Sequence, residues 1–198
     1  MSKLGRIIRF ACIGIAALVV GRFECSTAVA QAAANQQGIS SQGLQFSIAS
    51  ARSLGKSVSV QLLVRNTSQL RQYIMYCIIP SSGASLGSGQ KLVIATQKIT
   101  GIPYMSAGDI RSCFSNILLE NMTYIEPDSS LAILLNWYDA YNPNNEISPS
   151  NTISFPLNLA VRTETPLGVM DTSASRKEPG PIHAVNVGFP LIALSAGP

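Results

Sequence analysis

Apolar and polar side chains alternate with a period of two in several segments of the chain. In residues 58–64, valine and leucine alternate with serine and glutamine, and a polar Asn-Thr-Ser sequence follows. Such alternation puts the apolar side chains on one face of a β-strand. Residues 44–48 alternate in the same way, and Gly55 lies in a short segment between the two runs. The pair therefore predicts an antiparallel hairpin.

Further segments also predict strands, and they are residues 71–79, 91–99, 122–125, 131–138 and 153–161. The segments 71–79 and 131–138 are apolar on both faces, which is typical of central strands. Residues 153–161 alternate five times, but Pro156 lies on the outward face. Because proline within sheets is confined to edge strands and bulges, we expect an edge strand or a bulged strand there.

One segment has a helical period instead. Apolar residues recur at i, i+3, i+4, i+7 and i+8 from Ile110 to Leu118, and Asp109 before them suits a helix N-terminus. The alternative for residues 109–120 is an irregular strand or turn. The sequence leaves this choice open.

Six or seven strands with short turns and at most one short helix predict a mainly β protein. We expect an antiparallel β-sandwich over residues 43–163, rather than a fold of alternating strands and helices. From residue 164 the periodicity disappears, and proline and glycine punctuate residues 164–198. We expect an extended or disordered tail there. Residues 184–194 are nevertheless apolar enough to dock on the domain or on a partner.

The N-terminal 30 residues have the order of a cleavable signal peptide. Three basic residues precede an apolar stretch at 10–21, and Ala28-Val29-Ala30 offers a cleavage site before Gln31. An uncleaved anchor is the alternative. However, a twelve-residue helix spans about 18 Å against a hydrocarbon core of about 30 Å. We therefore expect export to the periplasm or secretion, and no stable membrane span after cleavage. Residues 31–42, which are rich in Gln, Ala and Ser, predict a flexible linker.

Removal of the leader changes the charge and cysteine inventory. Four basic residues and one acidic residue leave with it, so 14 basic and 10 acidic residues become 10 and 9. A nearly neutral chain gives no reason to expect a nucleic-acid partner. Two of the four cysteines also leave, and an even pair in an exported chain predicts a disulfide between Cys77 and Cys113. In the loop-entropy model such a bond contributes about 4 kcal/mol.

Three segments together resemble bacterial exported immunoglobulin-like domains. They are Phe46-x-Ile48, the run from Val58 to Ser68, and the run from Tyr124 to Leu131. The resemblance implies an immunoglobulin-like β-sandwich that acts as an accessory or binding module without catalytic residues. The chain departs from the usual immunoglobulin arrangement, because Trp137 follows both cysteines instead of lying between them.

Residues that could carry catalysis are few. The single histidine, His183, lies in the proline-rich tail with no carboxylate near it in sequence. This position argues against a histidine-dependent triad, and one histidine together with a disulfide leaves too few ligands for a zinc site. Ser53 and Lys56 have the S-x-x-K spacing of some serine hydrolases, but Gly55 between them favours a plain hairpin turn. We expect no enzyme, no cofactor and no metal site.

The segment after the most apolar strand is the best candidate for binding. Its Asp and Asn side chains supply oxygen atoms that can hold Ca²⁺, but the spacing is not that of an EF-hand, and a turn built from Asn and Pro is simpler. Aromatic side chains at its entrance offer contact area at low entropic cost. The candidate partner-binding residues are Trp137, Tyr138, Asp139, Tyr141, Asn142 and Asn144. Core packing is the alternative for Trp137 and Tyr138.

Two asparagines, Asn66 and Asn121, begin sequences that fit the glycosylation sequon. A signal peptide alone does not identify a eukaryote. Ending a strand or capping a turn is the simpler role for both side chains.

These patterns favour an exported, non-catalytic binding or accessory module of the cell envelope, whose partner is a protein or an envelope component. A structural subunit of a surface appendage, similar to pilins in having a leader, one disulfide and a β domain, is the alternative. The chain departs from pilins in lacking a cysteine near the mature N-terminus and a penultimate tyrosine. A hydrolase is the third alternative.

Overall fold

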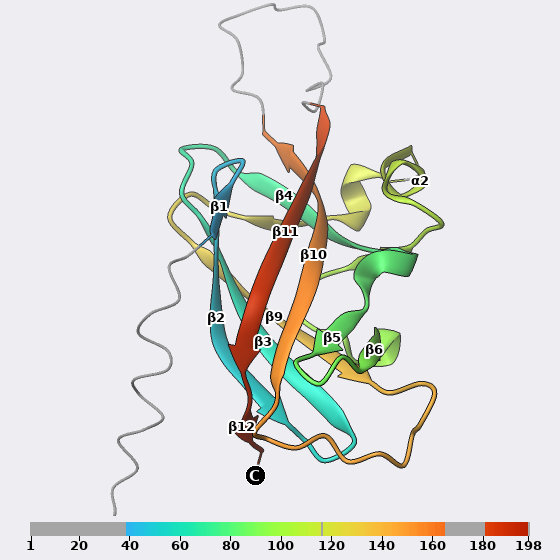
Figure 1. Cartoon of the computed structure of the whole chain (residues 1–198). Coiled ribbons are helices and arrows are strands. Elements are labelled where there is room, and N and C mark those ends of the chain that lie inside the picture. Colours follow the sequence, from blue (N-terminus) through green and yellow to red (C-terminus); the bar gives the residue numbers. More distant parts are fainter. Residues whose placement is uncertain (1–38, 116, 165–180, 198) are drawn as a thin grey trace, which may run out of the picture.

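The computed structural model describes residues 39–115, 117–164 and 181–197 (Figure 1). The protein is mainly β, and the α-helix of the described part is the short α2 (Ile110–Ser115). The strands are β1 (Ile39–Ser41), β2 (Leu44–Ser53), β3 (Ser57–Asn66), β4 (Gln72–Ile78), β5 (Ala84–Leu86), β6 (Lys91–Ile94), β7 (Tyr104–Ser106), β8 (Thr123–Ile125), β9 (Ser130–Tyr138), β10 (Thr152–Thr163), β11 (Ile182–Ala193) and β12 (Ser195–Ala196). Three 3-10 turns are η1 (Pro80–Ser82), η2 (Thr96–Lys98) and η3 (Leu119–Asn121).

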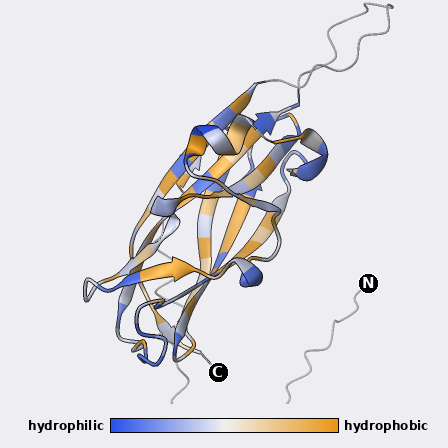
Figure 2. Ribbon diagram, turned by 90° about the vertical axis from the view of Figure 1, so that its right-hand side faces the viewer, coloured by the Kyte–Doolittle hydropathy of each residue, from blue (hydrophilic) through white to orange (hydrophobic). Residues whose placement is uncertain are grey.

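The predicted hairpin and the predicted central strand are both confirmed. β2 and β3 pair antiparallel along their whole length, and Gly55 in the turn between them has a φ of 72° that favours glycine. β9 lies between β3 and β6 in the sheet. Burial alternates along β2 and β3, and hydrophobic and hydrophilic stretches follow one another along strands in Figure 2. The period of two therefore placed β2 and β3 correctly.

The sheet is mixed, so the expectation of a purely antiparallel sheet is wrong. β7 pairs parallel with β4, and β12 pairs parallel with β2. A parallel pair needs a crossover connection, and residues 79–103, which carry β5 and β6, supply the one between β4 and β7. β7 and β12 have three and two residues, which is too short for a pattern of side chains to reveal them.

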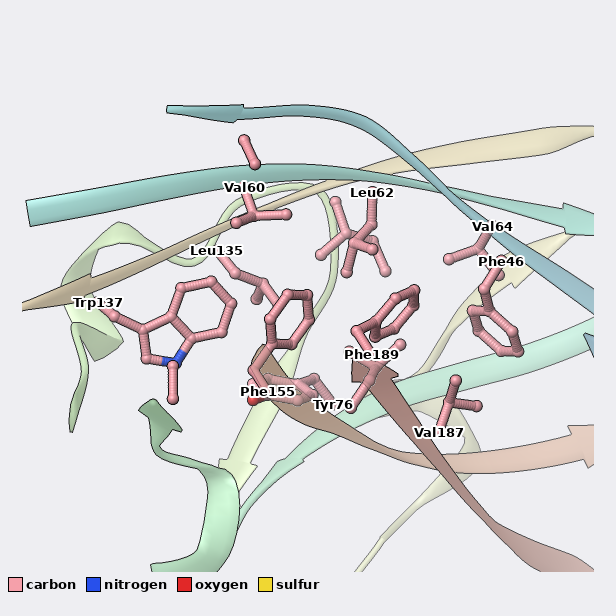
Figure 3. Packing of buried hydrophobic residues seen from close by; sticks show 14 of the residues in the cluster. Phe46, Val60, Leu62, Val64, Tyr76, Leu135, Trp137, Phe155, Val187 and Phe189 are labelled. Atoms are coloured by element: carbon pink, nitrogen blue, oxygen red, sulfur yellow. The ribbon is translucent and has the colours of Figure 1, made fainter. Parts of the chain in front are cut away.

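A single large core lies between two groups of strands. Figure 3 shows Val60, Leu62 and Leu135 of β3 and β9 facing Tyr76 of β4 and Phe155 of β10. Aromatic rings meet at the centre of this core. The ring centroids of Trp137 and Phe155 are 4.7 Å apart, and those of Phe155 and Phe189 are 4.9 Å apart. The long strands of the two groups therefore bury their apolar faces against each other.

The folded region extends beyond the predicted boundary at residue 163, because β11 is part of the sheet. It pairs antiparallel with β10 from Arg162↔Ile182 to Thr152↔Ala193. Val187 and Phe189 are buried in the core, so the expectation of an extended or disordered tail is wrong for residues 182–196. Residues 184–194 instead dock on the domain, as part of β11. β1 likewise falls within the predicted linker at 31–42.

A bulge explains why β11 was not recognised as a strand. Phe155 pairs with Phe189 and Ile153 pairs with Ile192, so two residues of β11 lie opposite Ser154 alone. Pro190 is one of these two residues, and bulges are among the few places in a sheet that accept proline. The bulge interrupts the period of two that would otherwise continue through residue 192.

β10 is a central strand, so the edge position considered for Pro156 is wrong. It pairs with β11 on one side and with β5 and then β4 on the other. Pro156 lies between the residues that pair with β5 and those that pair with β4. The bulge opposite Ser154 has its extra residue in β11 and not in β10, and Pro156 itself pairs with Gly188 in regular register.

The turn η1 lies beside β10, between β4 and β5 in the chain. Its residue Ser82 forms hydrogen bonds with several other segments. Its hydroxyl oxygen accepts bonds from the backbone N–H of Ile79 (3.0 Å) and from Asn158 Nδ2 (3.1 Å). Its carbonyl oxygen accepts a bond from Trp137 Nε1 (3.4 Å). Ser82 and Asn158 are both buried, so these bonds satisfy polar groups that water cannot reach.

A second, smaller apolar cluster lies apart from the large core, and we call it the outer cluster. Its buried members are Met75, Cys77, Cys113, Ile117, Met122 and Ala160. These residues belong to β4, β10 and the segment that contains β7, α2 and η3. The sequence left the choice between helix and irregular strand or turn open for residues 109–120, and the structure has the short helix α2 at residues 110–115 followed by η3.

Residues 91–99 were predicted as one strand, but only residues 91–94 form a strand. β6 ends at Ile94, and η2 follows at 96–98. Gly101 has a φ of 85°, and a Cβ at this position would collide with the Ala132 carbonyl of β9. The chain therefore passes very close to β9 here, and Thr100 forms an isolated bridge with Leu134.

The predicted leader at 1–30 lies outside the described residues. Within the described ranges, no helix is long and apolar enough to span a membrane.

Candidate functional site

The β9–β10 loop, residues 139–151, contains most of the candidate binding residues. Asp139 fixes its first turn, because Asp139 Oδ1 accepts hydrogen bonds from the backbone N–H of Tyr141 (2.9 Å) and of Asn142 (3.0 Å). Asp139 Oδ2 accepts a bond of 2.7 Å from Gln90 Nε2. This carboxylate is 6% exposed, and three bonds engage it. Asp139 therefore shapes the loop rather than facing a partner.

A second anchor joins the loop to the turn between β2 and β3. The backbone N–H of Ile147 donates to the Gly55 carbonyl (2.6 Å), and the Ser53 hydroxyl donates to the Ile147 carbonyl. Ile147 itself is buried in the large core. Nearer the tip, Lys56 Nζ donates to Asn144 Oδ1 (3.2 Å). The loop is thus fixed at both ends of its exposed part.

The aromatic residues predicted to bind a partner separate into two kinds. Trp137 is fully buried and packs on Phe155, so it is a core residue and its assignment to a binding surface is wrong. Tyr138 is 41% exposed, and Tyr141 is 88% exposed. The physical reason is the period of two, which turns Trp137 inward and its neighbour outward at the end of β9. Asn142 and Asn144 are exposed beside Tyr141.

The oxygen-rich sequence of the loop also raised the possibility of a Ca²⁺ site. Asp139 is engaged by its own loop and by Gln90. In the part of the chain that the structure describes, no group of three His, Cys, Asp or Glu side chains could hold a metal ion. These contacts favour the turn that was the simpler interpretation of this segment.

Sequence reasoning missed the residues that surround the loop. A hollow of about 490 Å³ lies between the loop, the turn after β2 and the end of β12. Its lining residues are Ser53, Gly55, Glu146, Ile147, Ser148, Pro149, Ala196 and Gly197. These segments are far apart in the sequence, and no local pattern could have brought the C-terminal pair to the loop.

The predicted disulfide is confirmed. Cys77 of β4 and Cys113 of α2 are bonded, with their Cα atoms 6.1 Å apart. Both residues are fully buried in the outer cluster. The bond therefore ties the segment that carries α2 to the sheet.

The two sequons differ in accessibility. Asn66 is fully buried, and its Nδ2 donates to the carbonyls of Leu70 (2.8 Å) and Ile125 (2.9 Å). It therefore ends β3 and caps the following turn, as the simpler interpretation expected. Asn121 is exposed at the end of η3.

Comparison with known proteins adds little. No family model matches the sequence, and no curated protein is significantly similar to it. Among solved structures, the chain is similar to the GAE domain in a crystal structure of yeast GGA1_GAE domain-P21, with 10% identity and a TM-score of 0.34. The match covers 77% of this chain and 96% of that chain. It is a weak resemblance in fold.

Proposed function

We propose that this chain is an exported, non-catalytic binding module of the cell envelope, periplasmic or secreted, with an immunoglobulin-like β-sandwich. Its partner is a protein or another envelope component, which contacts the β9–β10 loop. The observation that carries this proposal is Tyr141, which is 88% exposed on a loop fixed by Asp139 and Ile147. The hydrogen bonds hold the backbone of the loop, so a partner that contacts the exposed ring gains contact area at little further loss of backbone entropy.

The disulfide supports the exported location. Cys77 and Cys113 lie in the interior as a bonded pair. Such bonds form and persist in oxidising compartments and are rare in the reducing cytosol. The leader-like order of residues 1–30 agrees with this location.

The arrangement of strands supports the sandwich. β2, β3 and β9 pack their apolar faces against those of β4, β10 and β11 across one core. Two facing groups of strands around one core are the basis of sandwich folds. The short strands β7 and β12 add to these two groups in parallel, β7 beside β4 and β12 beside β2.

Site-specific photocrosslinking in the exporting cell tests the binding surface. A photoreactive phenylalanine derivative replaces Tyr141, and the same residue replaces Tyr124, which is 52% exposed on β8, as the control. We expect a discrete crosslinked product from position 141 and none of that size from position 124. Equal products from both positions, or none from position 141, would reject the loop as the contact surface.

One observation favours a second candidate, a structural subunit of a surface appendage. In the described part of the chain, the twelve-residue β11 pairs only with β10, so no strand is hydrogen-bonded to its other edge, where a strand from another molecule would add. Sedimentation of the purified exported protein separates the candidates. A monomer at high concentration supports the binding module, whereas polymers support the structural subunit.

A further inference from the structure

A groove beside the outer cluster brings together most of the methionines of this chain. Its volume is about 560 Å³, and it lies between β4, β7 and the segment from η3 to β8. Met75, Met105 and Met122 all line it, and they are three of the five methionines in the sequence. None of the residues proposed to contact a partner lines this groove.

Strand register explains why the three side chains meet. Met75 and Cys77 point to the same face of β4, and Met105 of β7 pairs with Cys77. The β4–β8 ladder ends at the pair Ile74↔Thr123, and the next residue on each strand places Met122 opposite Met75. The exposed fractions are 2% for Met75 and 8% for Met122, and Met105 is half-buried. The thioethers thus come from three different segments to one side of the sheet.

The chemistry of the lining selects one class of ligand. Thioether sulfur is a soft, neutral donor that suits Cu(I) and not the hard cations that take oxygen ligands. The carboxylate of Glu120 lines the same groove and supplies negative charge for a cation. No competing thiolate is present in the outer cluster, because Cys77 and Cys113 are bonded to each other. The groove therefore combines soft donors with one negative charge.

We propose that this groove binds one monovalent soft metal ion, Cu(I), through the Sδ atoms of Met75, Met105 and Met122, with Glu120 attracting the ion at the rim. The expectation of no metal site considered histidine, thiolate and carboxylate ligands, and thioethers were not among them. This proposal is independent of the partner-binding loop. Binding does not change the oxidation state of the ion.

Competition with a chromogenic Cu(I) chelator tests the proposal on the exported protein, with any free thiol first blocked by N-ethylmaleimide. We expect the protein to withdraw one equivalent of Cu(I) from the chelator. The variants Met75→Leu, Met105→Leu and Met122→Leu keep the side-chain volume and remove the sulfur, so each should weaken affinity at least about tenfold. Met170→Leu, which removes a methionine outside the described residues, is the control and should stay within about twofold of wild type. Failure to withdraw Cu(I), or equal loss in all four variants, would overturn the proposal.

A second measurement needs no variant in the groove and therefore does not depend on variant folding. The wild-type protein, labelled with ¹³C at the methionine methyl groups, is titrated with Ag(I) as an air-stable soft ion. We expect the three methyl signals of the groove to shift and saturate together at one equivalent, while the Met170 signal, assigned with Met170→Leu, does not move. No shift, or a shift of Met170 alone, would reject the site.

Discussion

The large core and the outer cluster are built in different ways. The core is formed by long strands, with ten residues each in β2 and β3 and twelve each in β10 and β11. The outer cluster is covered by short elements, the three-residue β7 and the six-residue α2, and a disulfide joins it to β4. Long ladders can hold their own apolar faces together, whereas short elements need another restraint. We infer that the outer cluster is a layer that depends on Cys77–Cys113, over a core that does not.

The largest effect should come from the core at β11. Phe189→Ala removes a ring that stacks on Phe155, and it should lower the free energy of unfolding by about 3 to 5 kcal/mol. Leu191→Ala on the same strand is the control, because Leu191 is 63% exposed and its loss should cost less than about 0.5 kcal/mol. Urea denaturation measures both. Equal effects would mean that β11 is not held in the core.

Loss of the disulfide should have the next largest effect. Replacing Cys77 and Cys113 together by alanine should lower the free energy of unfolding by about 2 to 4 kcal/mol, because the unfolded chain gains freedom. Urea denaturation measures the change. We expect the double variant to remain folded, since neither cysteine belongs to the large core. A variant that is unfolded in buffer would show that the core depends on this bond.

The pH dependence of the free energy of unfolding tests the burial of Tyr76, on the face of β4 that packs in the large core. Burial raises the pKa of the Tyr76 hydroxyl to about 12, whereas an unfolded tyrosine titrates near 10. The folded state thus favours the neutral phenol, and this stability is present below pH 10 and lost as the pH rises toward 12. The free energy of unfolding should fall by up to about 3 kcal/mol over this window. The Tyr76→Phe variant should show a smaller fall in urea denaturation at the same pH values, and an equal fall would contradict the assignment.

The smallest effect on the free energy of unfolding concerns Ser82 of η1, which is hydrogen-bonded to Trp137 of β9 and to Asn158 of β10. Ser82→Ala removes the acceptor for the Ile79 amide and for Asn158 Nδ2 and should cost about 1 to 3 kcal/mol. Ser150→Ala, at an exposed position of the β9–β10 loop, is the control and should cost less than about 0.5 kcal/mol. Both values come from urea denaturation. No difference between the two variants would show that these buried bonds add nothing.

The same comparison explains how far the sequence could predict the fold. The period of two identified β2, β3 and β10, and apolar residues on both faces identified β9. β11 was missed, since Pro190 and its bulge break the period, and β7 and β12 are too short to show one. These elements are fixed by pairing with strands distant in sequence, which local patterns do not encode.

The candidate site was predicted less well than the fold. The sequence predicted the disulfide, but it could not decide which aromatic residue of the candidate loop faces solvent. Trp137 and Tyr141 are only four residues apart, and the end of β9 between them separates core from surface. The convergence of three methionines on one groove was invisible for the same reason as β7, since it depends on register between distant strands.

Hydrogen exchange of the purified protein before and after reduction tests the dependence of the outer cluster on its disulfide most directly. We expect reduction to speed exchange of the amides in α2 greatly, while the amides of β3, β9 and β10 keep their protection. Equal loss of protection in all of these elements, or unchanged protection in α2, would contradict the separation of the outer cluster from the core.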